Sequence, residues 1–410
     1  MPDYRPLPEE QRDVFHEYVT YAFRPEDGPP AYDPEEHDTP QSKLGAKRGL
    51  YPDDAAEDAD PLCVCSHYWF DARVRGERHP TPGLSAVASP PEYRRGGYVR
   101  QLLEASLEEY REREPHFSIL WPFRYRFYRQ YGWETTNRHL LVESEPDDLS
   151  FAGERLASEL TAPTRYRKLE ADEWETLAPV YETHAGRHDL TLERSGDWWR
   201  YRIFQRWTTD PFVYAWERDG EPAAYVAYTI EGDWGDRTMM ISDIGYVDIE
   251  AFLAVLAFCR HHDSQVNAVR VRLPVDTPLF DVATDPDAFD AEYETGPMGR
   301  IVDVERTLSA LSYPGVDGSL TIQVSDPLVD WNDDTFVLTA DGGVGTCERV
   351  DGDSSSADVS LDIATLSQLA VGSRSVPALE RAGRLEATES VLETLSALFP
   401  ERPVYLGDGF

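Results

Sequence analysis

Between residues 62 and 134 the spacing of apolar positions changes from a period of about two to about 3.6 and back. Short apolar runs bounded by Pro and Gly predict strands, and an apolar stripe of period 3.6 predicts an amphipathic helix. The expected elements are strands over 62–74, 84–89 and 117–121, a helix over 97–113, and a turn followed by a helix over 123–133. The stripe of the first helix consists of Val99, Leu102, Leu103, Leu107 and Tyr110.

Residues 160–300 repeat this order more faintly, which we interpret as an internal duplication of one α+β module. The expected helices lie in 174–181, 198–204 and 252–258, and the expected strands in 212–216, 223–230, 239–245 and 266–273. Asp219-Gly220 predicts a hairpin turn between the first two of these strands. Residues 300–410 differ, with strands expected over 319–324 and 335–338 before helices over 363–370 and 390–398.

The segment before the first module divides into two parts. Residues 1–24 predict a short start and an amphipathic helix. Residues 25–61 are rich in Pro and acidic residues, and we expect a solvated loop or a lid there.

The charge of the chain excludes several classes of partner. The 410 residues include 39 Lys and Arg against 76 Asp and Glu, a formal net charge of −37. A chain this acidic has no electrostatic footprint for nucleic acid or an anionic membrane surface. We find no apolar stretch of about 18 residues and no secretory signal at the start, so we expect a cytoplasmic protein with neither partner.

The basic residues are almost all Arg, since Lys43, Lys47 and Lys168 are the only lysines. An acidic surface with so little Lys is typical of proteins from halophiles that accumulate salt. At about 1 M salt the screening length is roughly 3 Å, so self-repulsion is weak there and should return at low salt.

No set of residues has the spacing of a metal site. Cys63 and Cys65 lie in a strand-like run, and we expect them to be small buried side chains rather than ligands. His184 and His188 lack a third ligand, so we expect packing or surface histidines. The acidic segment 351–358 lacks the spacing of a calcium loop.

An anion site is expected where the strand over 84–89 leads into the helix over 97–113. Gly96-Gly97 stands at the start of this helix, where free backbone N–H groups and the absence of side chains favour an anion. Arg94, Arg95 and Arg100 add cationic donors suited to phosphate. A Gly-Gly turn flanked by arginines is often only a turn. Its position between a strand and a helix favours an anion-binding site instead.

Arg94-x-x-Gly97-x-Val99 resembles the R/Q-x-x-G-x-G/A signature of the GNAT acetyltransferases, with Val at the last, normally small, position. The segments 83–97 and 127–133 resemble one GNAT branch, the Eis (enhanced intracellular survival) acetyltransferases, and so do the C-terminal segments 299–304, 361–366 and 382–385. The resemblance implies an α+β protein with a GNAT domain over 1–147, a degenerate GNAT-like domain over 148–298 and a sterol-carrier-protein-like domain over 299–410.

The resemblance also implies a mechanism with acetyl-CoA as cosubstrate and no metal. Its pantetheine arm and thioester would be held by Val87, Ala88 and Ser89. Its pyrophosphate and remaining parts would be held by Arg94, Arg95, Gly96, Gly97, Tyr98, Val99, Arg100, Phe123 and Arg124. Tyr128 would be the general acid and the carboxylate of Phe410 the general base, although a tyrosine in an aromatic cluster and a chain terminus usually have no such role.

The second module lacks the anion site, because Ile244 to Ile249 contains no Arg and carries an acidic residue at the helix start. We therefore expect one cofactor site per chain. Ala86 stands where some relatives have a bulkier aromatic residue, so the acceptor is expected only as a primary amine of the aminoglycoside, polyamine or lysine type. The alternative is a non-enzymatic lipid-binding or scaffold protein. The resemblance further implies a homo-oligomer, a trimer or a hexamer.

Overall fold

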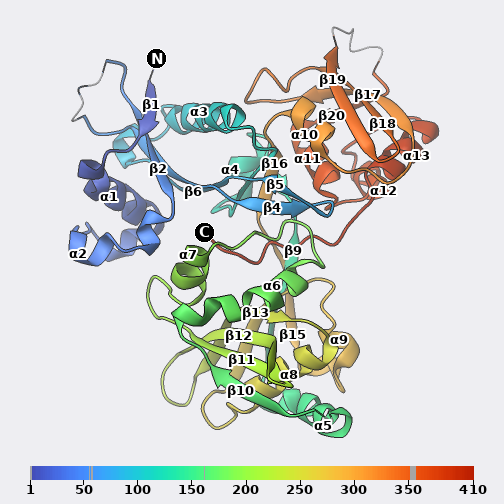
Figure 1. Cartoon of the computed structure of the whole chain (residues 1–410). Coiled ribbons are helices and arrows are strands. Elements are labelled where there is room, and N and C mark those ends of the chain that lie inside the picture. Colours follow the sequence, from blue (N-terminus) through green and yellow to red (C-terminus); the bar gives the residue numbers. More distant parts are fainter. Residues whose placement is uncertain (1, 55, 57–58, 161, 351–356) are drawn as a thin grey trace. The chain divides into compact units, whose positions relative to one another are not determined.

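The computed structural model describes all residues except 1, 55, 57, 58, 161 and 351–356. The chain forms two compact units (Figure 1). Unit 1 comprises residues 1–136, 297–404 and 408–410, and unit 2 comprises residues 137–296 and 405–407. None of the described helices is long and apolar enough to cross a membrane.

Unit 1 contains a seven-stranded sheet with the order β1-β2-β3-β6-β7-β16-β8. Its strands are β1 (Asp3–Pro6), β2 (Ala46–Tyr51), β3 (Cys63–Tyr68), β6 (Gly83–Ala88), β7 (Phe117–Leu120), β16 (Met298–Ile301) and β8 (Glu134–Thr135). The expected loop over 25–61 is therefore wrong in part, because β2 lies inside the sheet between β1 and β3. The same segment also contains the short helix α2 (Pro34–His37).

Two helices cover opposite faces of this sheet. Successive residues of a strand point to opposite faces, and Val64 packs with α1 (Arg12–Phe23) whereas Cys63 and Cys65 pack with α3 (Tyr98–Glu112). The predicted stripe of α3 is confirmed, since Leu102, Leu103, Leu107 and Tyr110 are fully buried there.

The expected long strand over 62–74 is divided in two. After β3 the chain forms a separate hairpin of β4 (Asp71–Val74) and β5 (Glu77–Pro80). Arg75 at its tip has a positive φ of 52° and is buried. Its guanidinium donates to the carbonyl oxygens of Ala370 at 2.8 Å and Leu398 at 2.9 Å, so it ties the hairpin to the C-terminal part of unit 1.

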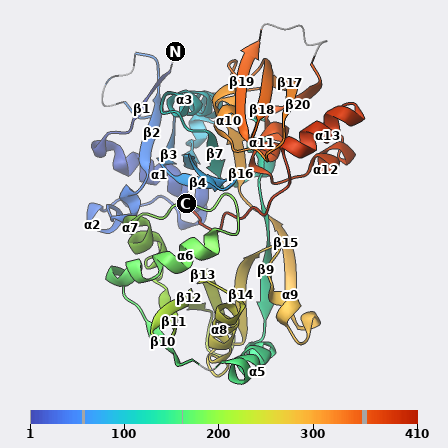
Figure 2. The same ribbon diagram turned by 45° about the vertical axis from the view of Figure 1, so that its right-hand side comes forward.

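That C-terminal part has a four-stranded sheet of order β19-β18-β17-β20, with β17 and β20 parallel (Figure 2). The strands are β17 (Gly318–Ser325), β18 (Thr335–Asp341), β19 (Val344–Val350) and β20 (Val359–Asp362). The helices are α10 (Val304–Ala310), α11 (Ile363–Val371), α12 (Val376–Arg381) and α13 (Glu389–Leu398). Every residue of α11 is buried, so this helix forms the centre of the domain.

Unit 2 contains a seven-stranded sheet of order β10-β11-β12-β13-β14-β9-β15. The strands are β9 (Arg138–Ser144), β10 (Thr164–Lys168), β11 (Phe212–Arg218), β12 (Glu221–Glu231), β13 (Thr238–Tyr246), β14 (Ala268–Pro274) and β15 (Asp290–Thr295). The helices are α5 (Ser150–Glu159), α6 (Ala178–Ala185), α7 (Gly196–Trp198), a π-helical turn (Trp199–Ile203), α8 (Ile249–Arg260) and α9 (Leu279–Val282). The predicted turn is present, with positive φ at Asp219 and Gly220.

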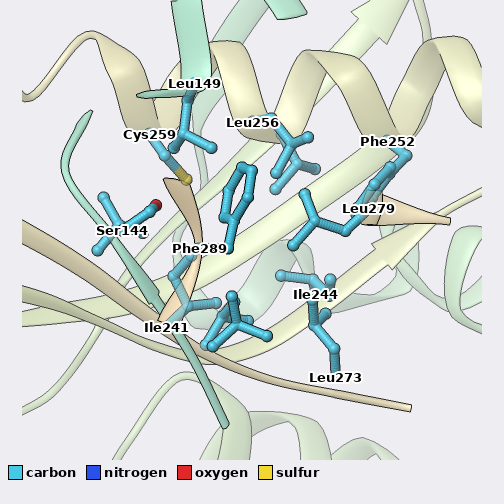
Figure 3. Close-up of a pocket in the computed structure, with 14 residues that line it drawn as sticks. Ser144, Leu149, Ile241, Ile244, Phe252, Leu256, Cys259, Leu273, Leu279 and Phe289 are labelled. Carbon is cyan, nitrogen blue, oxygen red and sulfur yellow. The ribbon is translucent and has the colours of Figure 1, made fainter. Parts of the chain in front are cut away.

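The expected duplication is visible in the order of elements, because both modules run from antiparallel strands through a helix to a parallel strand. In unit 2, β13 pairs in parallel with β14 after α8, as β6 does with β7 after α3. A cavity of about 20 Å³ lies between α8 and this sheet, lined by apolar side chains including Phe252, Leu256 and Phe289 (Figure 3). It has room for about one water molecule and not for a cosubstrate.

Candidate active site

Strands β6 and β7 diverge almost as soon as they meet. Gly83 and Ile119 form the one rung between them in the ranges that the structure describes. The backbone groups of residues 84–88 on the side of β7 therefore have no strand partner, and we call this stretch the open edge of β6. Unpaired backbone groups of this kind can accept a peptide-like ligand.

The open edge contains an irregular residue that the sequence did not indicate. Ala86 has a φ of 51°, in the left-handed region, and the register between β3 and β6 shifts at Val64 and Ser66. A bulge of this kind turns side chains toward a new direction and is common beside active sites. Val87, Ala88 and Ser89 follow this bulge and are buried.

The start of α3 leaves backbone donors free. Gly97 is in the left-handed conformation, with φ of 80°, and no side chain caps the helix. Within the described ranges, the N–H groups of Tyr98, Val99 and Arg100 donate to no protein acceptor. A Cβ at Gly96 would come within 2.6 Å of the Tyr98 ring, so a side chain there would displace this ring. Free N–H groups at a helix start attract anions, and the predicted anion site at this helix start stays a prediction.

The three arginines beside this helix start differ in what they contact. Arg94 donates to the carbonyl oxygen of Ser89 at 3.1 Å, and Arg100 pairs with Glu104 at 2.8 Å. Arg95 is exposed and has no partner among the described residues. Arg95 is therefore the arginine that the fold leaves available, whereas Arg94 and Arg100 already hold the loop and the helix.

Tyr128 lies in α4 (Tyr125–Arg129) and is only 4 % exposed. Its ring packs edge to face against Phe123, Phe127 and Trp133. Burial, with a smaller contribution from Cys65, raises the pKa of Tyr128 above that of a free tyrosine. Among the described residues its hydroxyl has no hydrogen-bond partner, and it is not one of the fully enclosed polar atoms that lack one.

Phe123 and Arg124 precede α4 on the surface. Phe123 is 59 % exposed, and its ring contacts both Phe127 and Tyr128. Arg124 is exposed as well. The structure thus brings the exposed ring of Phe123 beside Tyr128.

The C-terminal residues of unit 1 return to the start of the open edge. The Phe410 ring lies 5.1 Å from the Phe70 ring and 5.7 Å from the Tyr68 ring, measured between ring centres. Trp121, just after β7, donates from Nε1 to the carbonyl oxygen of Asp408 at 2.9 Å. A Cβ at Gly83 would approach the Phe410 ring to 2.6 Å, so the ring rests directly on the first residue of β6.

The sequence analysis missed a buried polar cluster behind the open edge. Glu109 of α3 accepts hydrogen bonds from Arg48 at 2.6 Å and from Tyr4 at 2.8 Å. Burial alone would raise the pKa of Glu109, but the hydrogen bonds that it accepts outweigh burial and lower it. Burial raises the pKa of the neighbouring Cys65 to about 12. The sequence feature that could have revealed this cluster was the presence of polar residues on the predicted apolar face of α3.

The cysteines and histidines considered above as possible metal ligands are buried or are held by other side chains. Cys63 and Cys65 are buried free cysteines, as expected. His184 packs against Tyr246, and His188 hydrogen-bonds to Asp276 at 2.9 Å. In the part of the chain that the structure describes, no group of three or more His, Cys, Asp or Glu residues could hold a metal ion, and 351–356 of the acidic segment lie outside it.

The helix start of the second module is already filled. The Asp248 side chain caps α8 by accepting from the Ala251 N–H at 2.9 Å. Arg218 donates to Asp248 at 2.8 Å and pairs with Glu250. The acidic residue predicted there is present, and its carboxylate occupies the position that an anion would take.

Three segments of the chain match protein families. Residues 3–136 and residues 190–301 each match a family described as acetyltransferase (GNAT) domain, and residues 304–407 match the family described as sterol carrier protein domain. An uncharacterized N-acetyltransferase of Streptomyces avermitilis is 25 % identical over 363 residues, covering 83 % of this chain and 86 % of that protein. One of Streptomyces griseus is 25 % identical over 350 residues, covering 80 % of each.

Solved structures have the same fold over the full length of both chains. A GCN5-related N-acetyltransferase from Anabaena variabilis superposes with a TM-score of 0.84 at 22 % identity. Eis1 from Mycobacterium abscessus superposes with a TM-score of 0.74 at 20 % identity. Each alignment covers 100 % of this chain and of the other, and at these identities the likeness shows the fold alone.

Proposed function

We propose that this chain, a GNAT N-acetyltransferase with two GNAT domains followed by a sterol carrier protein domain, transfers acetyl from acetyl-CoA to a primary amine in its first domain. The fold class expected from the sequence is confirmed by these three matches. The domain limits at 147 and 298 stay a prediction, and β9, which starts at Arg138, already belongs to the sheet of unit 2.

The first domain has the groups that acetyl-CoA requires. The free N–H groups at the start of α3 and the unpartnered Arg95 suit a pyrophosphate. The open edge of β6, followed by Val87, Ala88 and Ser89, suits the amides of the pantetheine arm. Gly96, Gly97, Tyr98 and Val99 would line the pyrophosphate, with Arg94 and Arg100 holding the loop in place. Phe123 and Arg124 would cover the bound molecule from the α4 side.

Bound acetyl-CoA supplies the electrophilic thioester carbonyl and a thiolate leaving group. Tyr128 is the proposed acid, because its raised pKa keeps the proton on Oη at neutral pH and the hydroxyl is not fully enclosed. Tyr128 belongs to the same buried cluster as Leu84 and Val87 of β6, the strand that carries the open edge.

The observation that carries the proposal is the Phe410 ring resting on Gly83. The ring contacts with Tyr68 and Phe70 and the Trp121–Asp408 hydrogen bond fix the last residues beside the rung at which β6 and β7 separate. A free terminal carboxylate has a pKa of about 3.5, so it is ionised at neutral pH. Desolvation raises its basicity, and in the proposal the carboxylate, desolvated or acting through a water molecule, accepts the proton that the attacking amine must lose. We therefore assign the base to Phe410.

The proposed acceptor is a primary amine of the aminoglycoside, polyamine or lysine type, as the family resemblance implies. These amines are cationic at neutral pH, so the negative charge of the terminal carboxylate would attract them. The small side chain of Ala86 on the open edge leaves room where a bulkier one would narrow it. Spermidine, kanamycin and a lysine peptide are therefore the three probe amines.

The test adds one glycine after Phe410 and measures thiol release from acetyl-CoA with the three probe amines. We expect kcat to fall at least tenfold, because the carboxylate is replaced by a neutral amide. Phe410→Tyr, which keeps both ring and carboxylate, is the control and should stay near the wild-type value. Unchanged turnover after the added glycine would reject Phe410 as the base.

The alternative of a lipid-binding protein would need a cavity in the C-terminal domain, and no observation favours it. The interior helix α11 is buried over its whole length, and the Arg75 guanidinium lies against the ends of α11 and α13. Assembly into a trimer or a hexamer stays a prediction.

A further inference from the structure

Two C-terminal motifs have no part in the chemistry proposed above, although the sequence singled them out. They are residues 361–366, at the end of β20 and the start of α11, and residues 382–385, after α12. The structure brings Asp362 of the first and Arg384 of the second to the residues around α4, the helix that carries Tyr128. Both motifs belong to the third domain, whereas α4 belongs to the first.

The meeting point is Glu134, the first residue of β8, which is 3 % exposed. Its Oε2 pairs with Arg129 at 2.8 Å and with Arg384 at 2.9 Å. Its Oε1 accepts from the Tyr125 hydroxyl at 2.8 Å. Arg129 and Tyr125 are the last and first residues of α4, so one buried carboxylate holds both ends of the helix, and the third domain contributes Arg384 to it.

Asp362 adds a second link to the same helix. Its Oδ2 accepts from Arg129 at 2.6 Å, and its Oδ1 caps α11 by accepting from the Thr365 N–H at 2.7 Å. Arg384 also donates to the Thr365 hydroxyl at 2.9 Å. Glu134, Arg129, Asp362 and Arg384 form a continuous network, which we call the α4 clamp.

The segment after α4 is held as closely. Arg300 of β16 is fully buried, donates to the carbonyl oxygen of Tyr131 and pairs with Asp326. A Cβ at Gly132 would come within 2.5 Å of Arg300 and 2.6 Å of Ile363 in α11. The chain from Tyr125 to Glu134 is therefore held by Arg300 of β16 together with Asp362, Ile363 and Arg384 of the C-terminal part of unit 1.

A helix of five residues has little stability of its own in water. The Tyr128 hydroxyl has no hydrogen bond in the described chain that would aim it, so its position depends on where the α4 backbone is held. We propose that the third domain positions the acid Tyr128 through the α4 clamp, with Arg384 and Asp362 as positioning residues. This inference rests on the proposed function, in which Tyr128 is the acid.

The experiment compares Arg384→Met with Arg381→Met, a matched control three residues away whose side chain is exposed and unpartnered in the described chain. Thiol release from acetyl-CoA is measured with the three probe amines, together with Tm. A misplacement of about 1 Å can cost up to roughly 100-fold in rate. We expect Arg384→Met to lower kcat about 10- to 100-fold with the KM for acetyl-CoA changed less than twofold, and Arg381→Met to leave both unchanged. Arg384→Lys should recover part of kcat.

A double-mutant cycle with Tyr128→Phe separates positioning from general stability. If the clamp acts through Tyr128, adding Arg384→Met to Tyr128→Phe lowers kcat no further. Asp362→Asn, which keeps a good helix cap but removes the charge facing Arg129, should behave in the same way and serves if Arg384→Met does not fold.

Losses in kcat that multiply in the double variant, or an Arg384→Met variant that loses Tm but not kcat, would overturn the inference while leaving the proposed function standing. A Tyr128→Phe chain with wild-type kcat would instead reject the acid assignment, and the inference would fall with it. No thiol release from the wild-type chain with any of the three amines would overturn the proposed function itself.

Discussion

Replacing Gly83 by alanine tests the proposed site at the point where the Phe410 ring rests. The added Cβ would lie 2.6 Å from Cε2 of Phe410 and 2.7 Å from Cε2 of Phe70. Ordinary contacts of this kind begin at 3.4 Å, so the Phe410 ring is short of room by at least 0.8 Å (3.4 less 2.6). The backbone of β6 stays in place because Gly83 is in an extended strand that alanine can adopt.

A displacement near 1 Å of a group that acts on the reacting amine can lower the rate by up to roughly 100-fold. We expect kcat of Gly83→Ala to fall about 10- to 100-fold, equivalent to about 1.4–2.7 kcal/mol in the activation barrier. The KM for acetyl-CoA should change less than twofold, because the proposed donor contacts begin at Val87. The assay is steady-state thiol release with spermidine and varied acetyl-CoA.

The control is Gly315→Ala in the same unit, where an added Cβ meets nothing within 4 Å. A chain lacking Phe410 completes the test, because Gly83→Ala should lower its residual rate no further. Wild-type kcat in Gly83→Ala would mean that Phe70 alone gives way and would refute the reasoning. An equal further loss in the chain without Phe410 would refute it as well.

Three more outcomes are expected. Arg95→Ala should raise the KM for acetyl-CoA roughly tenfold, as for a lost charged hydrogen bond, with Tm unchanged; an unchanged KM would remove Arg95 from the site. Calorimetric titration should find one acetyl-CoA per chain, because Asp248 fills the second helix start, and two would contradict this. Burial and the nearby Arg187 lower the pKa of His184 to about 3, whereas the pKa in the unfolded chain is about 6.5. The unfolded chain therefore binds the proton more readily, so the stability that neutral His184 contributes is complete above about pH 6.5 and declines as the pH falls toward 3. His184→Gln should therefore lose less Tm than the wild type between pH 7 and 4.5, and an equal loss would contradict this assignment.

The elements that the sequence predicted well are those whose pattern is local. The apolar stripe of α3 and the Asp219-Gly220 turn need only nearby residues, and both are confirmed. Strand β2 was missed because its neighbours along the chain are Pro-rich and acidic, whereas its strand character comes from pairing with β1 and β3. β16 enters the first sheet only after residues 137–296 of unit 2, and no local pattern indicates such a return.

The candidate site could likewise be predicted only where it depends on local sequence. The loop with Gly96 and Gly97 could be predicted, because its residue types indicate its backbone geometry. Spacing could not show that Arg94 is bound to the Ser89 carbonyl while Arg95 is left free, since this depends on side-chain contacts. The role of Gly83 depends on a residue more than 300 positions away, so the close fit of Phe410 could not be derived from local sequence.

The single rung between Gly83 and Ile119 has a consequence for the mechanics of unit 1. A sheet joined at one point opens there more easily than elsewhere, so the amide protons of residues 84–88 that face β7 should exchange early, unlike those that face β3. Bound acetyl-CoA that contacts both β6 and β7 would hold these two strands together where they separate. The free energy of unfolding would then increase with the concentration of the cosubstrate, by about 2.7 kcal/mol at a hundred times Kd. The molecule that supplies the acetyl group would therefore also stabilise the fold.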